Sequence, residues 1–221
     1  MLPENRYYLR EVGRRTVDLV EHDAQWAAQF ADVERELTAA LGEIVVGVHH
    51  IGSTAVPGLV AKCTIDVALE VRSIAEFMEA IPELEALGFE YRPTSWFDHD
   101  HAFLGRIRVD ERTHHLHVVA EGYAGVSDWL DFRDWLRANP DAVRRYAVVK
   151  RRLAEVHYAD RRAYVDGKTA IVEQLLAEAR SQRHLGASSS RSRTAGGSGT
   201  QRLTASRRVS PDSAQPHRGV R

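Results

Sequence analysis

A strand-like run, EIVVGVHHI, ends at Gly52 and Ser53, and these two residues together with Thr54 have the chemistry of an anion-binding turn. Gly52 allows a positive φ and a close approach by a ligand, and the two hydroxyl groups can donate hydrogen bonds. A short helical turn after Gly52 would point backbone N–H groups at a phosphate, and Lys62 would add a positive charge. The same residues are also typical of an ordinary tight turn, because a Pro-Gly pair follows them.

Asp66 lies on the next apolar run, CTIDVALEV, and is the first carboxylate after the turn. An aspartate near the start of a strand can hold a divalent cation, and the cation can bridge the phosphates of a nucleotide. A Gly-Ser turn followed by such an aspartate is an arrangement used in nucleotidyl transfer, where the turn holds the phosphates in line for attack. The pattern therefore predicts catalytic roles for Ser53, Lys62 and Asp66.

Histidines form a second candidate site. His115 and His117 alternate along the strand-like run HHLHVV, so both imidazoles would point to the same face, and His114 would point to the other. His50 closes the first strand beside the turn. His50, Asp66, His115 and His117 would form a mixed metal site that suits Zn²⁺ or Mn²⁺ better than Mg²⁺. The alternative is that each histidine is a hydrogen-bonded residue of the sheet.

Two helical stretches each carry a tyrosine and a lysine four residues apart. The pairs are Tyr146 with Lys150 and Tyr164 with Lys168, and each pair lies on one helix face. The lysines would lean over a cleft and neutralise phosphates, while a tyrosine would stack on a base. The alternative is a tyrosine that packs on a lysine stem at the surface. Trp129 fits a buried helix face and needs no further role.

The elements that must position these residues follow from periodicity and capping signals. Pro82 should kink or split its helix, and Ser127 is the expected N-cap of a later one. The order predicts an α+β domain whose mixed β-sheet is covered by helices. The predicted elements are a short strand at 16–21, helix 23–42, strands 43–51 and 63–71, helix 73–88, strand 89–96, a hairpin within 97–122, and helices within 127–140, 141–160 and 162–180.

The composition separates a folded part from a tail. The chain has 221 residues, of which 43% are hydrophobic, enough for one core of ordinary size. From residue 181 the chain is rich in Ser, Gly, Thr and Arg, and such a segment cannot bury enough apolar surface to order itself. We therefore expect a domain over 16–180 and a disordered basic tail over 181–221. The tail is either a solubilising extension or a contact for nucleic acid or another polyanion.

Cysteine content and hydropathy place the protein in a broad class. The single cysteine, Cys63, excludes an internal disulfide, and its place at the start of an apolar strand predicts a small core residue. The sequence contains no run of 18 apolar residues and no apolar segment typical of a signal peptide. The expected location is the cytoplasm, with no membrane partner.

The stretch HHIGSTAVPGLVAKCTIDVALEV closely resembles the signature of the GrpB family. The stretches DLVEHDAQWAAQF, HHLHVV, DFRDWLRANPDAVRRYAVVKRRLA and AYVDGKTAIVEQLL resemble the same family, so the resemblance covers residues 16–180. It implies a nucleotidyltransferase-like fold with C-terminal helices, Mg²⁺ as the cofactor, and a nucleotide or another phosphate-bearing small molecule as the partner. The residues implied in ligand binding are Gly52, Ser53, Thr54, Lys62, Lys150 and Lys168.

Ala68 departs from active nucleotidyltransferases, which carry a second acid at this place on the strand. Glu70 cannot replace it, because strand residues four apart lie about 13 Å from each other and cannot both reach one ion; a place at the strand end in solvent is expected for it. Three functions stay open. A metal-dependent nucleotidyltransferase with an unknown acceptor is narrowly favoured over a non-catalytic module that binds a nucleotide or coenzyme-A-type phosphate, and over a His/Asp metal-dependent hydrolase.

Overall fold

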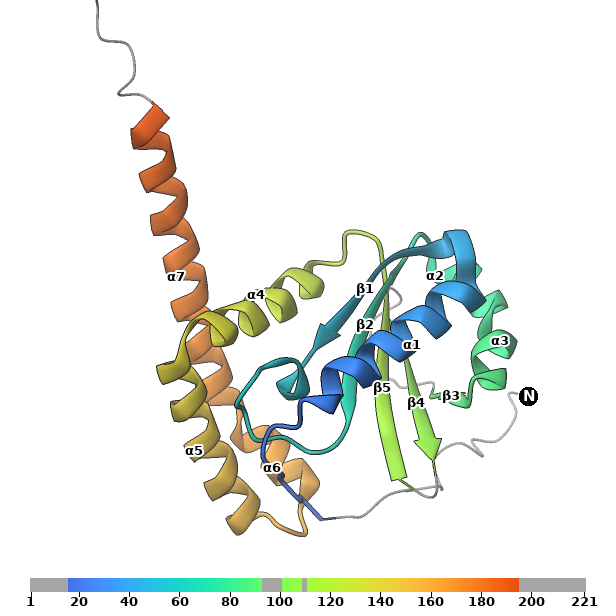
Figure 1. Cartoon of the computed structure of the whole chain (residues 1–221), viewed down its shortest axis with the longest axis horizontal. Helices are drawn as coiled ribbons and strands as arrows, with labels where there is room; N and C mark the ends of the chain where they lie inside the picture. Colours follow the sequence, from blue (N-terminus) through green and yellow to red (C-terminus); the bar gives the residue numbers. More distant parts are fainter. Residues whose placement is uncertain (1–15, 93–100, 109–110, 195–221) are drawn as a thin grey trace, which may run out of the picture. The chain divides into compact units, whose positions relative to one another are not determined.

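The computed structural model describes residues 16–92, 101–108 and 111–194. The sheet, helices α1–α6 and most of α7 belong to one compact unit, Met1–Arg183; the described part of the second unit is the helical stretch 184–194. The described elements are α1 (Gln25–Leu41), the 3-10 turn η2 (Gly42–Ile44), β1 (Val45–Ile51), the 3-10 turn η3 (Ser53–Ala55), β2 (Ile65–Val71), α2 (Ile74–Glu79), α3 (Ile81–Ala86), β3 (Phe89–Tyr91), β4 (His101–Arg108), β5 (Glu111–Ala120), α4 (Ala124–Ala138), α5 (Pro140–Val156), α6 (Arg161–Gly167) and α7 (Thr169–Thr194) (Figure 1).

The five strands form one mixed sheet in the order β1-β2-β5-β4-β3. The strands β2 and β5 are parallel, and the other neighbouring pairs are antiparallel. The register pairs Asp66 with His115 and Ala68 with His117. Because paired residues on neighbouring strands point to the same face, the candidate residues of β2 and β5 share one face of the sheet. The predicted α+β class with a mixed sheet and C-terminal helices is confirmed.

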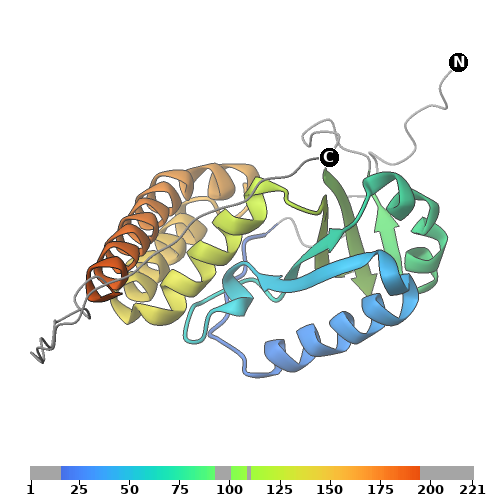
Figure 2. The ribbon, with the colours of Figure 1, turned by 90° about the horizontal axis from the view of Figure 1, so that it is seen from above.

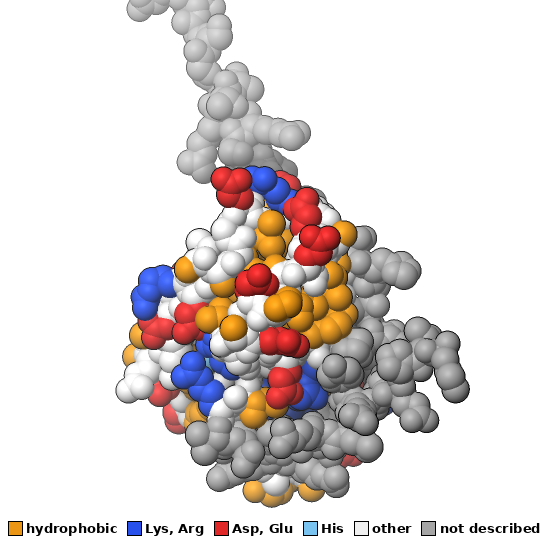
Figure 3. Space-filling model, turned by 90° about the vertical axis from the view of Figure 1, so that its right-hand side faces the viewer, with side chains coloured by type: hydrophobic (Ala, Val, Ile, Leu, Met, Phe, Trp, Pro, Cys, Tyr) orange, Lys and Arg blue, Asp and Glu red, His pale blue; other side chains and the backbone are white. Residues whose placement is uncertain are grey.

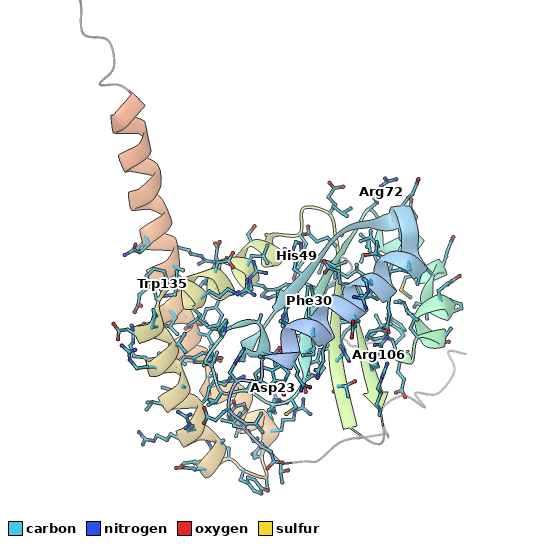
Figure 4. All side chains as sticks on the ribbon, in the orientation of Figure 1. Asp23, Phe30, His49, Arg72, Arg106 and Trp135 are labelled. Atoms are coloured by element: carbon cyan, nitrogen blue, oxygen red, sulfur yellow. The ribbon has the colours of Figure 1, made fainter. Side chains whose placement is uncertain are left out.

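Helix α1 covers the other face of the sheet, as Figure 2 shows. Its buried residues Trp26, Val33, Leu37 and Leu41 recur at helical spacing and pack on β2 and β5 residues that alternate with the candidate site residues. Figure 4 labels Phe30 on this helix and Arg106 on β4. The buried residues of β2 and β5 in this core are Ile65, Val67, Leu69, Val71, Leu116 and Val118.

A second core joins the segment after η3 to the C-terminal helices. Val56, Leu59 and Val60 are almost fully buried and pack against residues of α4, α5 and α7, among them Leu136 and Leu175. Figures 1 and 2 show these helices grouped at the side of the sheet where β1 ends. The turn that follows β1 is therefore held between the sheet and the helices, and this placement fixes its position relative to α5 and α7.

The acidic residues of α2 and α3 lie away from this junction. Figure 3 shows the side of the molecule where these helices lie, with acidic side chains scattered among hydrophobic ones. The acids of the two helices are Glu76, Glu79, Glu83 and Glu85. Among the described helices, none combines the length and apolar character needed to span a bilayer.

Several predicted boundaries differ from the structure. Helix α4 begins at Ala124 with Tyr123 as its N-cap, so the prediction that Ser127 caps it was wrong. The helix predicted over 162–180 is divided at Lys168, and its second part continues to Thr194. The predicted strand at 16–21 is reduced to one bridge between Val20 and Ala61.

Pro82 has the predicted effect. It lies in the first turn of α3, where its missing N–H costs nothing, and the helical stretch is split into α2 and α3 at Ala80. Cys63, in contrast, is exposed, so the prediction of a core residue was wrong. The reason is that β2 begins only at Ile65 and the chain turns just before it, with the Thr64 N–H donating to the Lys62 carbonyl at 2.7 Å.

Candidate functional site

A pocket of about 720 Å³ lies on the face of the sheet opposite α1, between the ends of β1 and β2 and the helices α4, α6 and α7. This volume is in the range of small-molecule sites in proteins. The pocket brings together the residues predicted from the sequence, with the exception of His50 and Tyr146. The predicted residues in its lining are Gly52, Ser53, Thr54, Lys62, Asp66, His115, His117, Lys150 and Lys168.

Gly52 lies directly against Asp66. Ile51 ends β1 and pairs with Asp66 on β2, and Gly52 follows with φ 72° and ψ −169°, a conformation adopted almost only by glycine. A Cβ atom at Gly52 would lie 2.3 Å from Oδ2 of Asp66. The absence of a side chain is therefore what lets the turn approach the carboxylate. The 3-10 turn that begins at Ser53 is the short helical turn expected after Gly52.

Asp66 is hydrogen-bonded to His115. Nδ1 of His115 lies 2.8 Å from Oδ1 of Asp66, and the Asp66 side chain is half-buried. Burial opposes ionisation of Asp66, but this hydrogen bond and the charges of His115, His117 and Lys62 outweigh it and hold the pKa of Asp66 below its ordinary value. Asp66 is therefore an anion at neutral pH. Nε2 of His115 is buried and has no hydrogen-bond partner in the described structure.

Three lysines and Arg161 line the same pocket as this carboxylate. Lys62 precedes β2, Lys150 lies on α5, and Lys168 joins α6 to α7. Burial is the main cause that lowers the pKa of each lysine, to about 8 for Lys62 and about 7 for Lys150. Mutual repulsion among the cations lowers these pKa values further, while Asp66 raises them. Asp66 thus shares the pocket with four cationic side chains, while the other carboxylate of the lining, Asp128, is paired with Arg180.

Lys150 is held in a single position. Its side chain is 2% exposed, its Nζ donates a hydrogen bond to the Val60 carbonyl, and it lies 5.3 Å from the centre of the Tyr146 ring. The Tyr146 hydroxyl in turn shares a hydrogen bond with the Ser53 side chain, and burial raises the pKa of Tyr146. Helix α5 therefore supports both the turn and a lysine beside it.

Tyr164 supports the other two lysines. Nζ of Lys168 lies 4.8 Å and Nζ of Lys62 6.0 Å from the centre of its ring, so these contacts are cation–π interactions. Tyr164 is 1% exposed and Tyr146 is 4% exposed. The tyrosines are thus built into the wall behind the lysines, and their burial argues against the predicted stacking of a base on either ring.

His50 lies on the opposite face of the sheet. It pairs with Val67, a residue of the core beneath α1, and its ring stacks on Phe30 with centroids 4.7 Å apart. Its Nε2 lies 3.0 Å from the Thr54 hydroxyl, and burial lowers its pKa to about 4. The predicted metal cluster with Asp66 and the strand histidines is therefore not assembled. Among the described residues, no group of three or more His, Cys, Asp or Glu side chains is arranged to hold a metal ion.

The place expected for a second acid is closed. Ala68 is fully buried between its strand neighbours His49 and His117 and does not line the pocket. Glu70 is half-buried rather than in solvent, because Nε2 of His49 lies 2.7 Å from its carboxylate. His117 approaches Nε2 of His101 at 3.2 Å. This region of the sheet holds imidazoles where a two-metal enzyme holds acids.

Two further features of the pocket were missed in the sequence. Arg161 lies three residues before Tyr164 and seven before Lys168, so all three lie on one helix face. This spacing in the sequence indicates that Arg161 belongs with them. Trp129 and Phe132 are three residues apart on α4 and both line the pocket, although Trp129 was assigned to a buried face without a role. His99 lies outside the described residues, and His101 is the first residue of β4.

The fold and the pocket define an α+β protein in which a Gly-Ser turn, the Asp66 carboxylate, one buried lysine and two partly buried lysines share a cavity. The chain belongs to the GrpB family, since the model of that family, described as GrpB protein, matches residues 16–178. The UPF0157 protein BH1888 of Halalkalibacterium halodurans is 36% identical over 166 residues, which cover 74% of this chain and 83% of that protein. The family expected from the sequence signature is confirmed.

A solved structure of the family shows the same fold. The crystal structure of the conserved protein GrpB from Enterococcus faecalis has a TM-score of 0.70 and 30% identity, and the match covers 75% of this chain and 99% of that one. A more distant likeness, with a TM-score of 0.43 and 10% identity, is to Cid1 in complex with its short product ApU. That match covers 59% of this chain and 41% of the Cid1 chain.

Proposed function

We propose that this protein binds the phosphate groups of a nucleotide in the pocket at the Gly-Ser turn. The observation that carries the proposal is that Lys62, Lys150, Lys168 and Arg161 line one pocket with Asp66, while the other carboxylate of the lining, Asp128, is paired with Arg180. The pKa values of the lysines are lowered chiefly by burial and further by repulsion among the cations, so nearby negative charge would stabilise their protonated forms. A polyphosphate supplies that charge, so part of the cost of burying the lysines is offset when the ligand binds.

The turn would orient the phosphates. Gly52 brings the turn against Asp66, so phosphates bound at the 3-10 turn would lie beside this carboxylate and any cation on it. The Ser53 side chain, hydrogen-bonded to Tyr146, offers a further polar contact. Lys62 and Lys168 line the same pocket, each beside the Tyr164 ring. Several donors and cations in one pocket support the binding of a di- or triphosphate.

Asp66 suits one divalent cation and not two. Its Oδ1 atom accepts from His115, and its Oδ2 atom lies beside Gly52. Mg²⁺ is commonly held by one or two carboxylates together with substrate phosphates, and this donor set fits that description. A bound cation would supply charge neutralisation at the phosphates. A zinc or manganese site that includes His50 finds no support, because that side chain lies on the other face.

Metal-dependent nucleotidyl transfer to an unknown acceptor is the second candidate function. It is favoured by the ionised carboxylate that lies between the turn and the lysines, the position from which a cation can bridge phosphates. It is weakened by Ala68, because the usual second acid is missing. Release of pyrophosphate from a nucleoside triphosphate by the purified protein distinguishes transfer from binding alone.

Asp66→Ala is expected to abolish the Mg²⁺-dependent part of the thermal stabilisation by a nucleotide. A ligand at about a hundredfold excess over its Kd adds about 2.7 kcal/mol, which raises the Tm of a domain of this size by about 5–10 °C. Thermal melts of the parent and the variant with ATP, with and without Mg²⁺, measure this difference. Asp128→Ala is the matched control, since Asp128 also lines the pocket but is paired with Arg180. An Asp66→Ala variant that responds to Mg²⁺ like the parent shows that Asp66 holds no cation.

The affinity for a triphosphate is expected to fall by at least about tenfold between pH 7 and pH 9. Burial lowers the pKa of Lys150 to about 7 and that of Lys62 to about 8, so both lose charge in this window. The terminal phosphate has a pKa of about 6 and is already ionised. Binding restores the protonated lysines, so protons should be taken up near pH 8. Calorimetric titration in two buffers of different ionisation enthalpy measures the uptake, and its absence would contradict the proposed role of the lysines.

A further inference from the structure

The pocket has a second, apolar part that phosphate binding does not use. Besides the cations, its lining contains hydrophobic and aromatic side chains from the three helices α4, α6 and α7. An inorganic polyphosphate has no apolar surface that could pack against these side chains, because it is charged along its whole length. The apolar residues in question are Trp129, Phe132, Val165, Val172 and Leu176.

The position of Trp129 shows how far this apolar part lies from Asp66, where the phosphates are proposed to bind. Its ring lies 5.4 Å from the His117 ring, and His117 pairs with Ala68, two residues along β2 from Asp66. Successive strand residues rise by about 3.3 Å, so Trp129 lies over a layer roughly 7 Å along the sheet from the carboxylate. A ribose is the kind of linker that can join a phosphate near Asp66 to a ring near Trp129.

Trp129 is held at its edges and partly exposed. His101, His117 and Tyr123 surround the indole with interplanar angles of 61°, 54° and 44°, so none of these rings lies parallel to it. The residue is neither fully buried nor fully exposed. Tyr146 does not line the pocket, and Tyr164, which does, is 1% exposed and lies against two lysines. Phe132 also lines the pocket but contacts the Tyr146 ring edge to face. Trp129 offers the larger aromatic surface in the lining, and we take it as the stacking residue.

We infer that the apolar wall is a nucleobase site, with the base stacked on Trp129, and that the ligand is a purine nucleotide. This inference rests on the proposed function, since the phosphates anchor the ligand whose base it describes. Stacking on an aromatic side chain gains free energy with the area of overlap, and a two-ring base overlaps an indole more fully than a one-ring base does. Val172 and Leu176 on α7 supply apolar surface in the same cavity.

The first test compares ligands on the unaltered full chain. Calorimetric titration with Mg²⁺ is carried out with ATP, UTP and tripolyphosphate. ATP is expected to bind at least about tenfold more tightly than tripolyphosphate, with UTP between them. If ATP and tripolyphosphate bind equally well, the base site is refuted while the phosphate pocket stands. If none of the three binds, the proposed function fails as well, so the two failures are distinguishable.

The second test removes the indole. Trp129→Ala is expected to lower the affinity for ATP by about 10- to 100-fold and to leave the affinity for tripolyphosphate unchanged. Trp129→Phe, which keeps an aromatic face, should retain most of the ATP affinity. Tyr158→Ala removes an aromatic residue that is 52% exposed and does not line the pocket, and it serves as the matched control. An equal loss for ATP and tripolyphosphate in Trp129→Ala would overturn the inference, because Trp129 would then act only on the shape of the pocket.

Discussion

Gly52→Ala is expected to lower the free energy of unfolding by about 3 kcal/mol or more and to abolish binding of a nucleotide. Two separate costs add at this position. The backbone has φ 72° and ψ −169°, which a residue with a Cβ atom adopts only under strain. The new Cβ atom would also lie 2.3 Å from Oδ2 and 2.9 Å from Cγ of Asp66. Either the turn or the carboxylate must move, and both belong to the pocket.

Gly58→Ala separates these two costs. Gly58 also has a positive φ, of 77°, but a Cβ atom there would have no neighbour within 4 Å. This control should cost only about 1–2 kcal/mol for the backbone conformation and should leave binding intact. Urea unfolding at equilibrium gives the two free energies, and calorimetric titration with ATP gives the affinities. Equal stability and equal affinity of the two variants would show that the turn and Asp66 are not in contact.

The contact between the turn and the carboxylate is also the part of the site that the sequence predicts best. Gly52, Ser53 and Asp66 belong to two consecutive strands joined by one loop, and antiparallel neighbours bring the end of one strand to the start of the next. The order of these two strands in the sequence is therefore enough to predict that Gly52, Ser53 and Asp66 lie close together. The lysines Lys150 and Lys168 are distant in the chain, so their spacing places each beside a tyrosine on one helix face but does not place it next to the turn.

His50 shows why the sequence predicted a metal cluster that the fold does not assemble. Side chains on a strand alternate between faces, so a shift of one residue moves an imidazole from the pocket to the core. His50 pairs with Val67 and not with Asp66, and the sequence does not contain that register. Its preceding neighbour His49 is on the pocket face but is engaged with Glu70. The face of the sheet to which a strand side chain points can be predicted only when the partner strand and its register are known.

The predictions for Trp129 and Cys63 were wrong for a different reason. The surroundings of these two residues come from elements that are far away in the chain. An aromatic residue on an amphipathic helix is most simply read as core, yet α4 presents Trp129 to a cavity shared with α7. An apolar run beginning at Cys63 reads as strand, yet the chain turns at Thr64 before β2 begins. Tertiary packing decides both cases, and periodicity in one segment carries no information about it.

Lys150→Met is expected to lower the affinity for a triphosphate by about 10- to 100-fold at pH 7, because a hydrogen bond from a charged donor is worth about 1.5–3 kcal/mol. Lys150 is 2% exposed and its amino group already donates to the Val60 carbonyl, so it is positioned before a ligand arrives. Methionine has a similar length and no charge. Arg152→Met, an exposed position on the same helix, makes the same change in net charge and is the matched control. Its effect on affinity should be small, since exposed charges are screened by salt.

The same variant separates a buried cation from a structural residue through the dependence of stability on pH. Burial lowers the pKa of Lys150 from 10.5 to about 7, so between these values the unfolded chain binds a proton that the folded chain does not. The free energy of unfolding of the parent should therefore rise with pH across this window. Lys150→Met should lose the part of that rise that Lys150 contributes, whereas Lys62 and Lys168, whose pKa values are also lowered, keep the rest. The loss of the donor to the Val60 carbonyl lowers stability at every pH and adds no slope of its own. Urea unfolding of parent and variant from pH 6 to pH 10 measures both effects. Parallel curves would show that Lys150 keeps an ordinary pKa, and the case for a pocket with surplus positive charge would then fail at its most buried cation.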